Sequence, residues 1–158
     1  MGDNETGKQI VKEAREIYYM ENTFTVKSHR ICEFGRDNLA DRKPMAIEPL
    51  VRGIIVRVDL EHIYDIDVAH GTFAPVDGWV VRDLRQLLEF TNAKSIGIEV
   101  RGGGAPDGSD LRIQQKIKEI SGIVKELIKQ YGEKLTIRKM MRNDDGQWKS
   151  HDLRSYWN

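Results

Sequence analysis

Four side chains that can bind a metal ion lie close together in the sequence. His62, Asp65, Asp67 and His70 fall within residues 62–70, and imidazole and carboxylate ligands suit zinc or manganese. A metal held there could activate water in a hydrolase. The ligands lie in a long stretch that contains glycine and proline, and ligand number without geometry is weak evidence for a site. We therefore predict a polar surface loop that binds no metal or other cofactor, and keep a metal-assisted hydrolase as an alternative function.

A glycine-rich stretch, residues 102–108, lies between a predicted strand and a predicted helix, where phosphate-binding loops occur. It lacks the Gly-Lys-Ser/Thr ending of a P-loop. Asp107 and Asp110 would also repel a phosphate group at the start of the helix. The stretch is therefore predicted to cap that helix rather than to bind a nucleotide.

Two carboxylates, Asp59 and Glu99, fall on neighbouring predicted strands, as the partners in general acid–base catalysis often do. Catalysis of that kind needs a concave, partly dry pocket that shifts one of the two pKa values. An open charged sheet provides no such pocket, and Arg57 and Arg101 can pair with the two carboxylates. No catalytic residue is predicted, and the chain is not expected to be an enzyme.

Basic and aromatic side chains gather near the end of the chain, and this combination can stack nucleobases and hold phosphates. They are Arg138, Lys139, Arg142, Trp148, Lys149, Arg154, Tyr156 and Trp157. Asp144, Asp145 and Asp152 dilute the positive charge, and no known nucleic-acid-binding motif is present. Aromatic residues in such a place commonly seal the end of a core. Nucleic acid is therefore not the expected partner, and binding to it stays a second alternative.

Helices and strands alternate along the chain. The apolar periodicity predicts helices over 7–20, 29–39, 79–90 and 110–131, and strands over 24–27, 51–60, 96–101 and 135–138. Loops are expected over 41–49, 61–78 and 102–108, and no element is assigned to residues 148–158. We expect one domain over residues 1–158, with a flexible tail over residues 1–6.

Two details concern how the predicted helices pack. Ile10, Ala14 and Ile17 share one face of the first helix, which should therefore pack on the core. Gly122 lies in the middle of the longest helix, where glycine costs about 1 kcal/mol relative to alanine. Such a residue indicates that another part of the chain packs closely against the helix there.

The alternation of strands and helices predicts an α/β fold with a mostly parallel sheet. Buried parallel strands are usually apolar on both faces, but these strands have one apolar face and one charged face, as in residues 54–59. The helices should therefore cover a single face. Right-handed crossovers on one side then add the strands in sequence order, as in a short, irregular leucine-rich-repeat array. An α+β sandwich with some antiparallel pairing is the fallback.

The charged face of this sheet is the predicted binding surface. Mixed charges on an open face suit the recognition of a protein partner, because charged pairs provide specificity and register. The predicted partner-binding residues are Lys27, Arg57, Asp59, Glu99, Arg101 and Arg138. The alternative is a solvated ladder of cross-strand ion pairs, each contributing about 0.2–1 kcal/mol. An exposed sheet edge also allows a homodimer.

The composition sets limits on the class of protein. Lys and Arg together number 25, as do Asp and Glu, so no overall field draws the chain to nucleic acid or to acidic membranes. Cys32 is the only cysteine, which rules out an internal disulfide and favours a reducing compartment. No stretch reaches the roughly 20 apolar residues that cross a bilayer. An intracellular protein, cytoplasmic or nuclear, is therefore expected.

One segment carries a family resemblance. Residues 13–24, with the sequence EAREIYYMENTF, resemble the EAR-x-IYY-x-ENTF signature of a set of fungal F-box-like proteins. In those proteins this helix-and-strand element precedes irregular strand–helix units similar to leucine-rich repeats. The later segments 51–60 and 87–101 fit that layout. The resemblance implies an interaction module of this architecture and supplies no catalytic residues.

Overall fold

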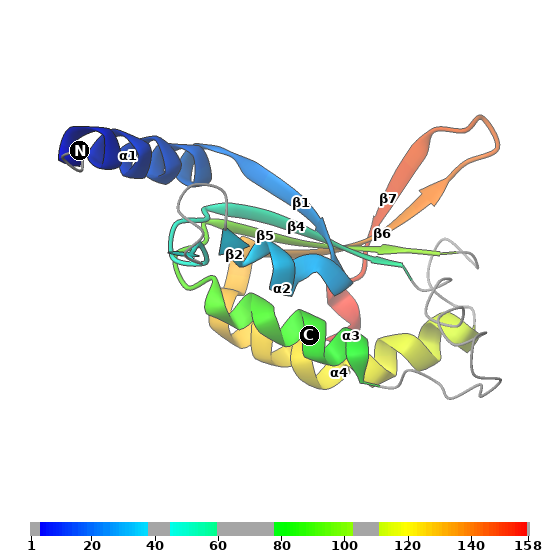
Figure 1. Ribbon diagram of the computed structural model, residues 1–158. Coiled ribbons are helices and arrows are strands. Elements are labelled where there is room, and N and C mark those ends of the chain that lie inside the picture. Colours follow the sequence, from blue (N-terminus) through cyan, green and yellow to red (C-terminus); the bar gives the residue numbers. More distant parts are fainter. Residues whose placement is uncertain (1–3, 38–44, 60–77, 103–110, 158) are drawn as a thin grey trace, which may run out of the picture.

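A five-stranded sheet organises the molecule, a computed structural model that describes residues 4–37, 45–59, 78–102 and 111–157 (Figure 1). The strands are β1 (Thr23–Lys27), β4 (Gly53–Asp59), β5 (Ser95–Arg101), β6 (Leu135–Arg142) and β7 (Trp148–Asp152). They lie in that order, the first four parallel and β7 antiparallel to β6. The predicted α/β fold with a mostly parallel sheet and sequential strands is confirmed.

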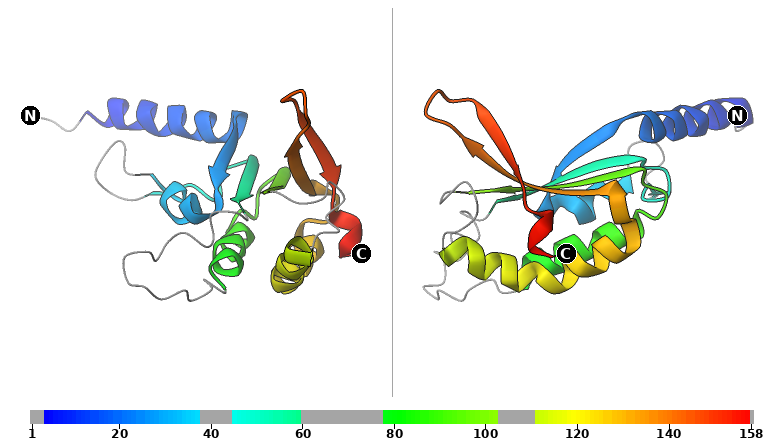
Figure 2. Two further views of the ribbon diagram at one scale, coloured as in Figure 1. Left: turned by 90° about the vertical axis from the view of Figure 1, so that its right-hand side faces the viewer. Right: turned by 180° about the vertical axis from the view of Figure 1, so that it is seen from behind.

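The helices after β1 lie on one face of the sheet. Figures 1 and 2 show α2 (Ile31–Phe34), α3 (Trp79–Arg85) and α4 (Leu111–Tyr131) on the same side. The inward positions of β4 and β5, such as Val56 and Ile98, are almost fully buried. Each such apolar side chain contributes about 1.5–3 kcal/mol when it is removed from water. The predicted one-sided arrangement is therefore present, and of the sandwich fallback only the antiparallel pairing occurs, between β6 and β7 and in a separate two-stranded sheet.

The first helix forms as predicted but does not pack as predicted. α1 (Glu5–Glu21) begins at Glu5, two residues before the predicted start at residue 7, and Asn4 caps it by accepting a hydrogen bond from the Gly7 amide at 3.2 Å. Ile10 and Ile17 are 61% and 62% exposed. The expected packing of this face is wrong, because α1 projects away from the sheet at the start of β1 (Figure 1). Of the predicted tail over residues 1–6, residues 5 and 6 belong to α1 and Asn4 caps it, while residues 1–3 lie outside the described residues.

Residues 29–39 do not form the single helix that was predicted. A 3₁₀ turn over Ser28–Arg30 leads into the one-turn helix α2, which ends at Gly35. β2 (Arg36–Asp37) then pairs with β3 (Met45–Ala46). β3 lies within residues 41–49, which were predicted to be a loop. A side chain at position 35 would meet the carboxylate of Glu48. The segments around Gly35 and Glu48 therefore lie close together just before β4. The local apolar pattern of residues 29–39 does not reveal this contact.

The end of the chain contains a strand that was not predicted. β6 continues to Arg142, beyond the predicted end at residue 138, and forms a hairpin with β7 that rises on the side of the sheet opposite α4 (Figure 1). Every residue of β7 is exposed, so β7 has no alternation of apolar and polar positions that could reveal it. Leu153 and Trp157 follow and are buried, as expected for residues that seal a core.

A buried phenol ties the end of α4 to the segment after α3. That segment is a 3₁₀ turn over Gln86–Glu89, which completes the predicted helix over 79–90. The Tyr131 hydroxyl donates a hydrogen bond to the Leu87 carbonyl oxygen at 2.6 Å. Burial raises the pKa of Tyr131 from 10.0 to about 12. The folded chain therefore holds the Tyr131 proton more tightly than the unfolded chain does. The contribution of this protonated hydroxyl to the free energy of unfolding is complete below pH 10 and is lost as the pH rises from 10 to 12.

Gly122 is predicted to be a site of easy stabilisation. It is exposed, and a Cβ at this position would have no atom within 4 Å, so the expected close packing is wrong. Gly122→Ala should therefore raise the free energy of unfolding by about 1 kcal/mol, because alanine loses less backbone entropy in a helix. Urea denaturation followed by circular dichroism measures the change.

Gly132→Ala is the matched control, since Gly132 also has open space around it but has a φ of 54°. An L-residue in that left-handed conformation costs about 1–2 kcal/mol, so this variant should be less stable than the wild type. Equal effects of the two substitutions would contradict the described path of α4.

Candidate functional site

The face of the sheet opposite α2, α3 and α4, here called the open face, carries the charged side chains. Alternation along each strand places every second residue on it, and the register aligns these residues across the strands. One row crosses all five strands and consists of Lys27, Arg57, Glu99, Arg138 and Asp152. None of the described helices α2–α4 covers this face (Figure 2).

A second row lies one step further along the strands. Asp59 is opposite Arg101, and Arg101 is opposite Met140 and, through it, Ser150. The structure thus brings all six predicted partner-binding residues onto one surface, four of them in the first row and Asp59 and Arg101 in the second.

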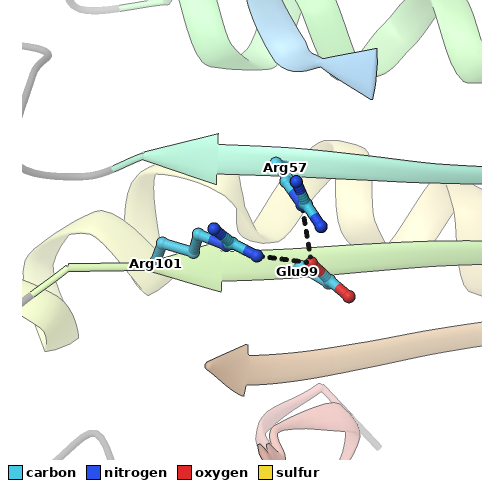
Figure 3. Close-up of polar contacts among 3 residues, drawn as sticks. All are labelled: Arg57, Glu99 and Arg101. Carbon is cyan, nitrogen blue, oxygen red and sulfur yellow. Dashed lines mark hydrogen bonds and ion pairs between the residues drawn. The ribbon is translucent and has the colours of Figure 1, made fainter. Parts of the chain in front are cut away.

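Glu99 is the centre of the charge network. Its Oε2 accepts a hydrogen bond from Arg57 Nε at 3.1 Å and one from Arg101 Nη2 at 3.4 Å (Figure 3). The Glu99 side chain is only 20% exposed, so both contacts are partly shielded from water. In the register Arg57 stands opposite Glu99, and Arg101 opposite Asp59. The expected ion-pair role of the two arginines is confirmed for Glu99, with which both of them pair.

Three residues that were not predicted for this surface extend it onto the hairpin. Arg142 and Trp148 face each other across β6 and β7, and Asp152 ends the first row. The guanidinium carbon of Arg101 lies 4.5 Å from the centre of the Trp148 ring, and that of Arg142 lies 5.5 Å from it. The alternation along β6, continued from Arg138, would have placed Arg142 on this surface. Trp148 could not have been placed there without knowing that β7 pairs with β6.

The open face carries an excess of positive charge. Its cations are Lys27, Arg57, Arg101, Arg138 and Arg142, and its anions are Asp59, Glu99 and Asp152. Five against three leaves a local charge of +2 on a chain whose overall formal charge is zero. Lys27 and Arg138 make no ion pair with any residue that the structure describes.

The neighbouring row of the open face carries no charge. Thr25, Ile55, Gly97 and Thr136 form the row next to the charged one. A Cβ at Gly97 would lie 3.3 Å from Ile55 Cγ1 and 3.5 Å from Thr136 Oγ1, so glycine allows its neighbours to pack over the strand.

The C-terminal basic and aromatic residues do not form one surface. Lys139 and Trp157 are buried, and Arg154 Nη1 donates a hydrogen bond to the Leu135 carbonyl oxygen at 2.9 Å. Only Arg138, Arg142 and Trp148 reach the open face. The surface on which the nucleic-acid alternative was based is therefore divided between the two sides of the sheet.

The other predicted candidates can be placed only in part. The 62–70 ligand set lies outside the described residues, as do residues 103–110 of the glycine-rich stretch. Within the described ranges, no three His, Cys, Asp or Glu side chains gather as metal ligands would. Cys32 is exposed. Among the helices that the structure describes, none combines the length and the apolar character needed to cross a bilayer.

A shallow groove of about 510 Å³ lies between α4 and the 3₁₀ turn over Arg154–Tyr156. Its lining is mixed polar and apolar, from Gln114, Gln115, Ile117, Lys118, Ser121, Tyr156 and Trp157. It shares no residue with the open face, so the two are separate surfaces.

Comparison of the chain with known protein families, with curated proteins and with solved structures found no match.

Glu99→Gln is predicted to lower the free energy of unfolding by about 1 kcal/mol, because it leaves two neighbouring guanidinium groups without their shared carboxylate. Urea denaturation at low and high salt measures the effect, which should shrink as salt screens the repulsion.

Glu126→Gln is the control, because Glu126 pairs with Arg85 at 3.3 Å and both side chains are about half exposed. Exposed pairs contribute little, so this change should stay below about 0.5 kcal/mol. If the two variants lost the same stability, Glu99 would not hold the network together.

Proposed function

We propose that this chain is a non-catalytic protein-interaction module whose open face binds a protein partner. The observation that carries the proposal is the charged row that crosses all five strands, from Lys27 to Asp152, on the face opposite the helices. A row of mixed charge, held in place by the sheet, suits specific recognition, because a partner gains affinity only when its own charges are in register.

The ion pairs of Glu99 are compatible both with this proposal and with the alternative, a solvated ladder of cross-strand ion pairs. They fix Arg57 and Arg101 in place before any partner arrives, which lowers the entropy lost on binding. They also leave Lys27 and Arg138, which make no ion pair with any described residue, as charges that a partner can neutralise. A ladder that served stability alone would be expected to pair these two residues as well.

The architecture is consistent with the resemblance of residues 13–24 to fungal F-box-like proteins. We propose that the chain is a strand–helix module of that kind, with the sheet as its binding surface, as in leucine-rich-repeat arrays. We place it inside the cell, in the cytoplasm or nucleus, on the grounds of its single cysteine.

Affinity capture from a fungal lysate with quantitative mass spectrometry tests the proposal. The open-face variant is Lys27→Glu with Arg138→Glu, which reverses the charge of two residues that make no ion pair with a described residue. The control is Lys125→Glu with Lys129→Glu, which makes the same change of charge at exposed positions of α4. Circular dichroism confirms that both variants fold.

We expect one or more proteins to be captured by the wild type and by the control, and to fall at least about tenfold with the open-face variant. Equal capture by both variants, or capture of nothing by the wild type, would contradict binding through the open face.

A further inference from the structure

We infer that Arg101, Arg142 and Trp148 form a carboxylate-binding site, which holds an acidic side chain of an Asp- and Glu-rich segment of the partner. The inference rests on the proposed function and names the chemistry of the partner. The three residues lie where the open face meets the hairpin, on β5, β6 and β7.

The indole ring holds both guanidinium groups in place. Arg101 and Arg142 lie 4.5 Å and 5.5 Å from the centre of the Trp148 ring, distances at which the positive charge is attracted to the π-system. Trp148 remains 48% exposed, so the cluster is open to solvent. A guanidinium group offers the paired N–H donors that a carboxylate accepts in a bidentate contact, and two such groups lie beside this ring.

Both arginines have hydrogen-bond donors to spare. An arginine carries five N–H donors, yet the one ion pair of Arg101 among the described residues is the 3.4 Å contact with Glu99. Its Nε has no hydrogen-bond partner but is buried, so the donors that remain for a partner are those of the two terminal nitrogens. Arg142 is exposed and makes no ion pair with a described residue. An incoming carboxylate would therefore satisfy donors that the chain itself does not use.

The surrounding charges favour an acidic segment that runs over the sheet. From the cluster, Arg138, Arg57 and Lys27 continue the positive charge across the open face, where cations exceed anions by five to three. Asp144 and Asp145 lie in the turn between β6 and β7. Their charges repel an acidic segment from the tip of the hairpin and direct it toward the sheet.

The geometry favours a carboxylate over a nucleic acid. Proteins that bind single strands stack bases on free aromatic faces, whereas two guanidinium groups already lie over the Trp148 ring. The chain also has no net positive charge, and neutralising a phosphate backbone depends on an excess of Lys and Arg. An acidic peptide, by contrast, needs only the local excess on the open face.

Fluorescence anisotropy with the full chain tests the inference at low salt. The probe is a fluorescein-labelled oligoglutamate peptide, with oligoglutamine and oligouridylate of the same length as comparisons. The variants are Arg101→Gln, which also loses the Glu99 contact, and Arg142→Gln, which breaks no ion pair with a described residue. Arg85→Gln, at an exposed position of α3 on the opposite side of the sheet, is the matched control.

We expect oligoglutamate to bind the wild type and Arg85→Gln equally, and to bind Arg142→Gln about tenfold more weakly. Oligoglutamine should not bind. Trp148→Phe should weaken binding as well, because the smaller ring holds the guanidinium groups less firmly.

Three results would overturn the inference: no binding of oligoglutamate, equal binding by Arg142→Gln and the wild type, or tighter binding of oligouridylate. These outcomes are distinct from failure of the proposed function. If partners captured by the wild type are lost with Lys27→Glu and Arg138→Glu but retained with Arg142→Gln, the open face binds protein and the carboxylate site is wrong.

Discussion

The burial of one face of the sheet against α3 and α4 is the interaction on which the rest of the structure depends. Val56 and Ile98 on the strands meet a layer that includes Leu84, Val124 and Leu127 on the helices, and all are almost completely removed from water. Apolar burial is the main favourable term in folding. It fixes the register of every strand, because a shift by one residue would turn the apolar side chains outward. The charged rows on the other face are therefore set by the core beneath them.

That constraint links the core to the candidate site. With the register fixed, Arg57 must stand opposite Glu99, and Asp59 opposite Arg101. Glu99 can then bind two guanidinium groups through one oxygen, which leaves the remaining cations of the open face available to a partner. The hairpin adds Trp148, whose ring centre lies 4.5 Å from the guanidinium carbon of Arg101. In the proposed function, Glu99 would serve stability and the cations around it on the open face would serve binding.

The sequence was informative where the pattern was local and repeated. β4 alternates from Ile54 onward and β5 over its whole length, so their buried and open faces, and the positions of Arg57 and Glu99, followed from the sequence. α1 was different, because an amphipathic helix reveals which side is apolar but not whether anything covers that side. β7 was missed since all its residues are exposed, and the contact between Arg101 and Trp148 depends on its pairing with β6. Residues 29–39 were misassigned because the helix ends at Gly35, where a Cβ would meet the Glu48 side chain. Glu48 comes from a later segment, so the local pattern does not reveal this contact.

The central claim is that the sheet has one covered face and one open face, and cysteine labelling tests it most directly. In a Cys32→Ser background, Thr136→Cys lies on the open face and Ile98→Cys on the covered face, since Thr136 is exposed and Ile98 is 1% exposed. The rate of reaction with a thiol reagent under native conditions is compared with that of Cys32 in the wild type, which is exposed. Thr136→Cys should react at a rate close to that of Cys32, while Ile98→Cys should react only after unfolding. Protection of both cysteines would show that a second layer covers the open face and would contradict this account.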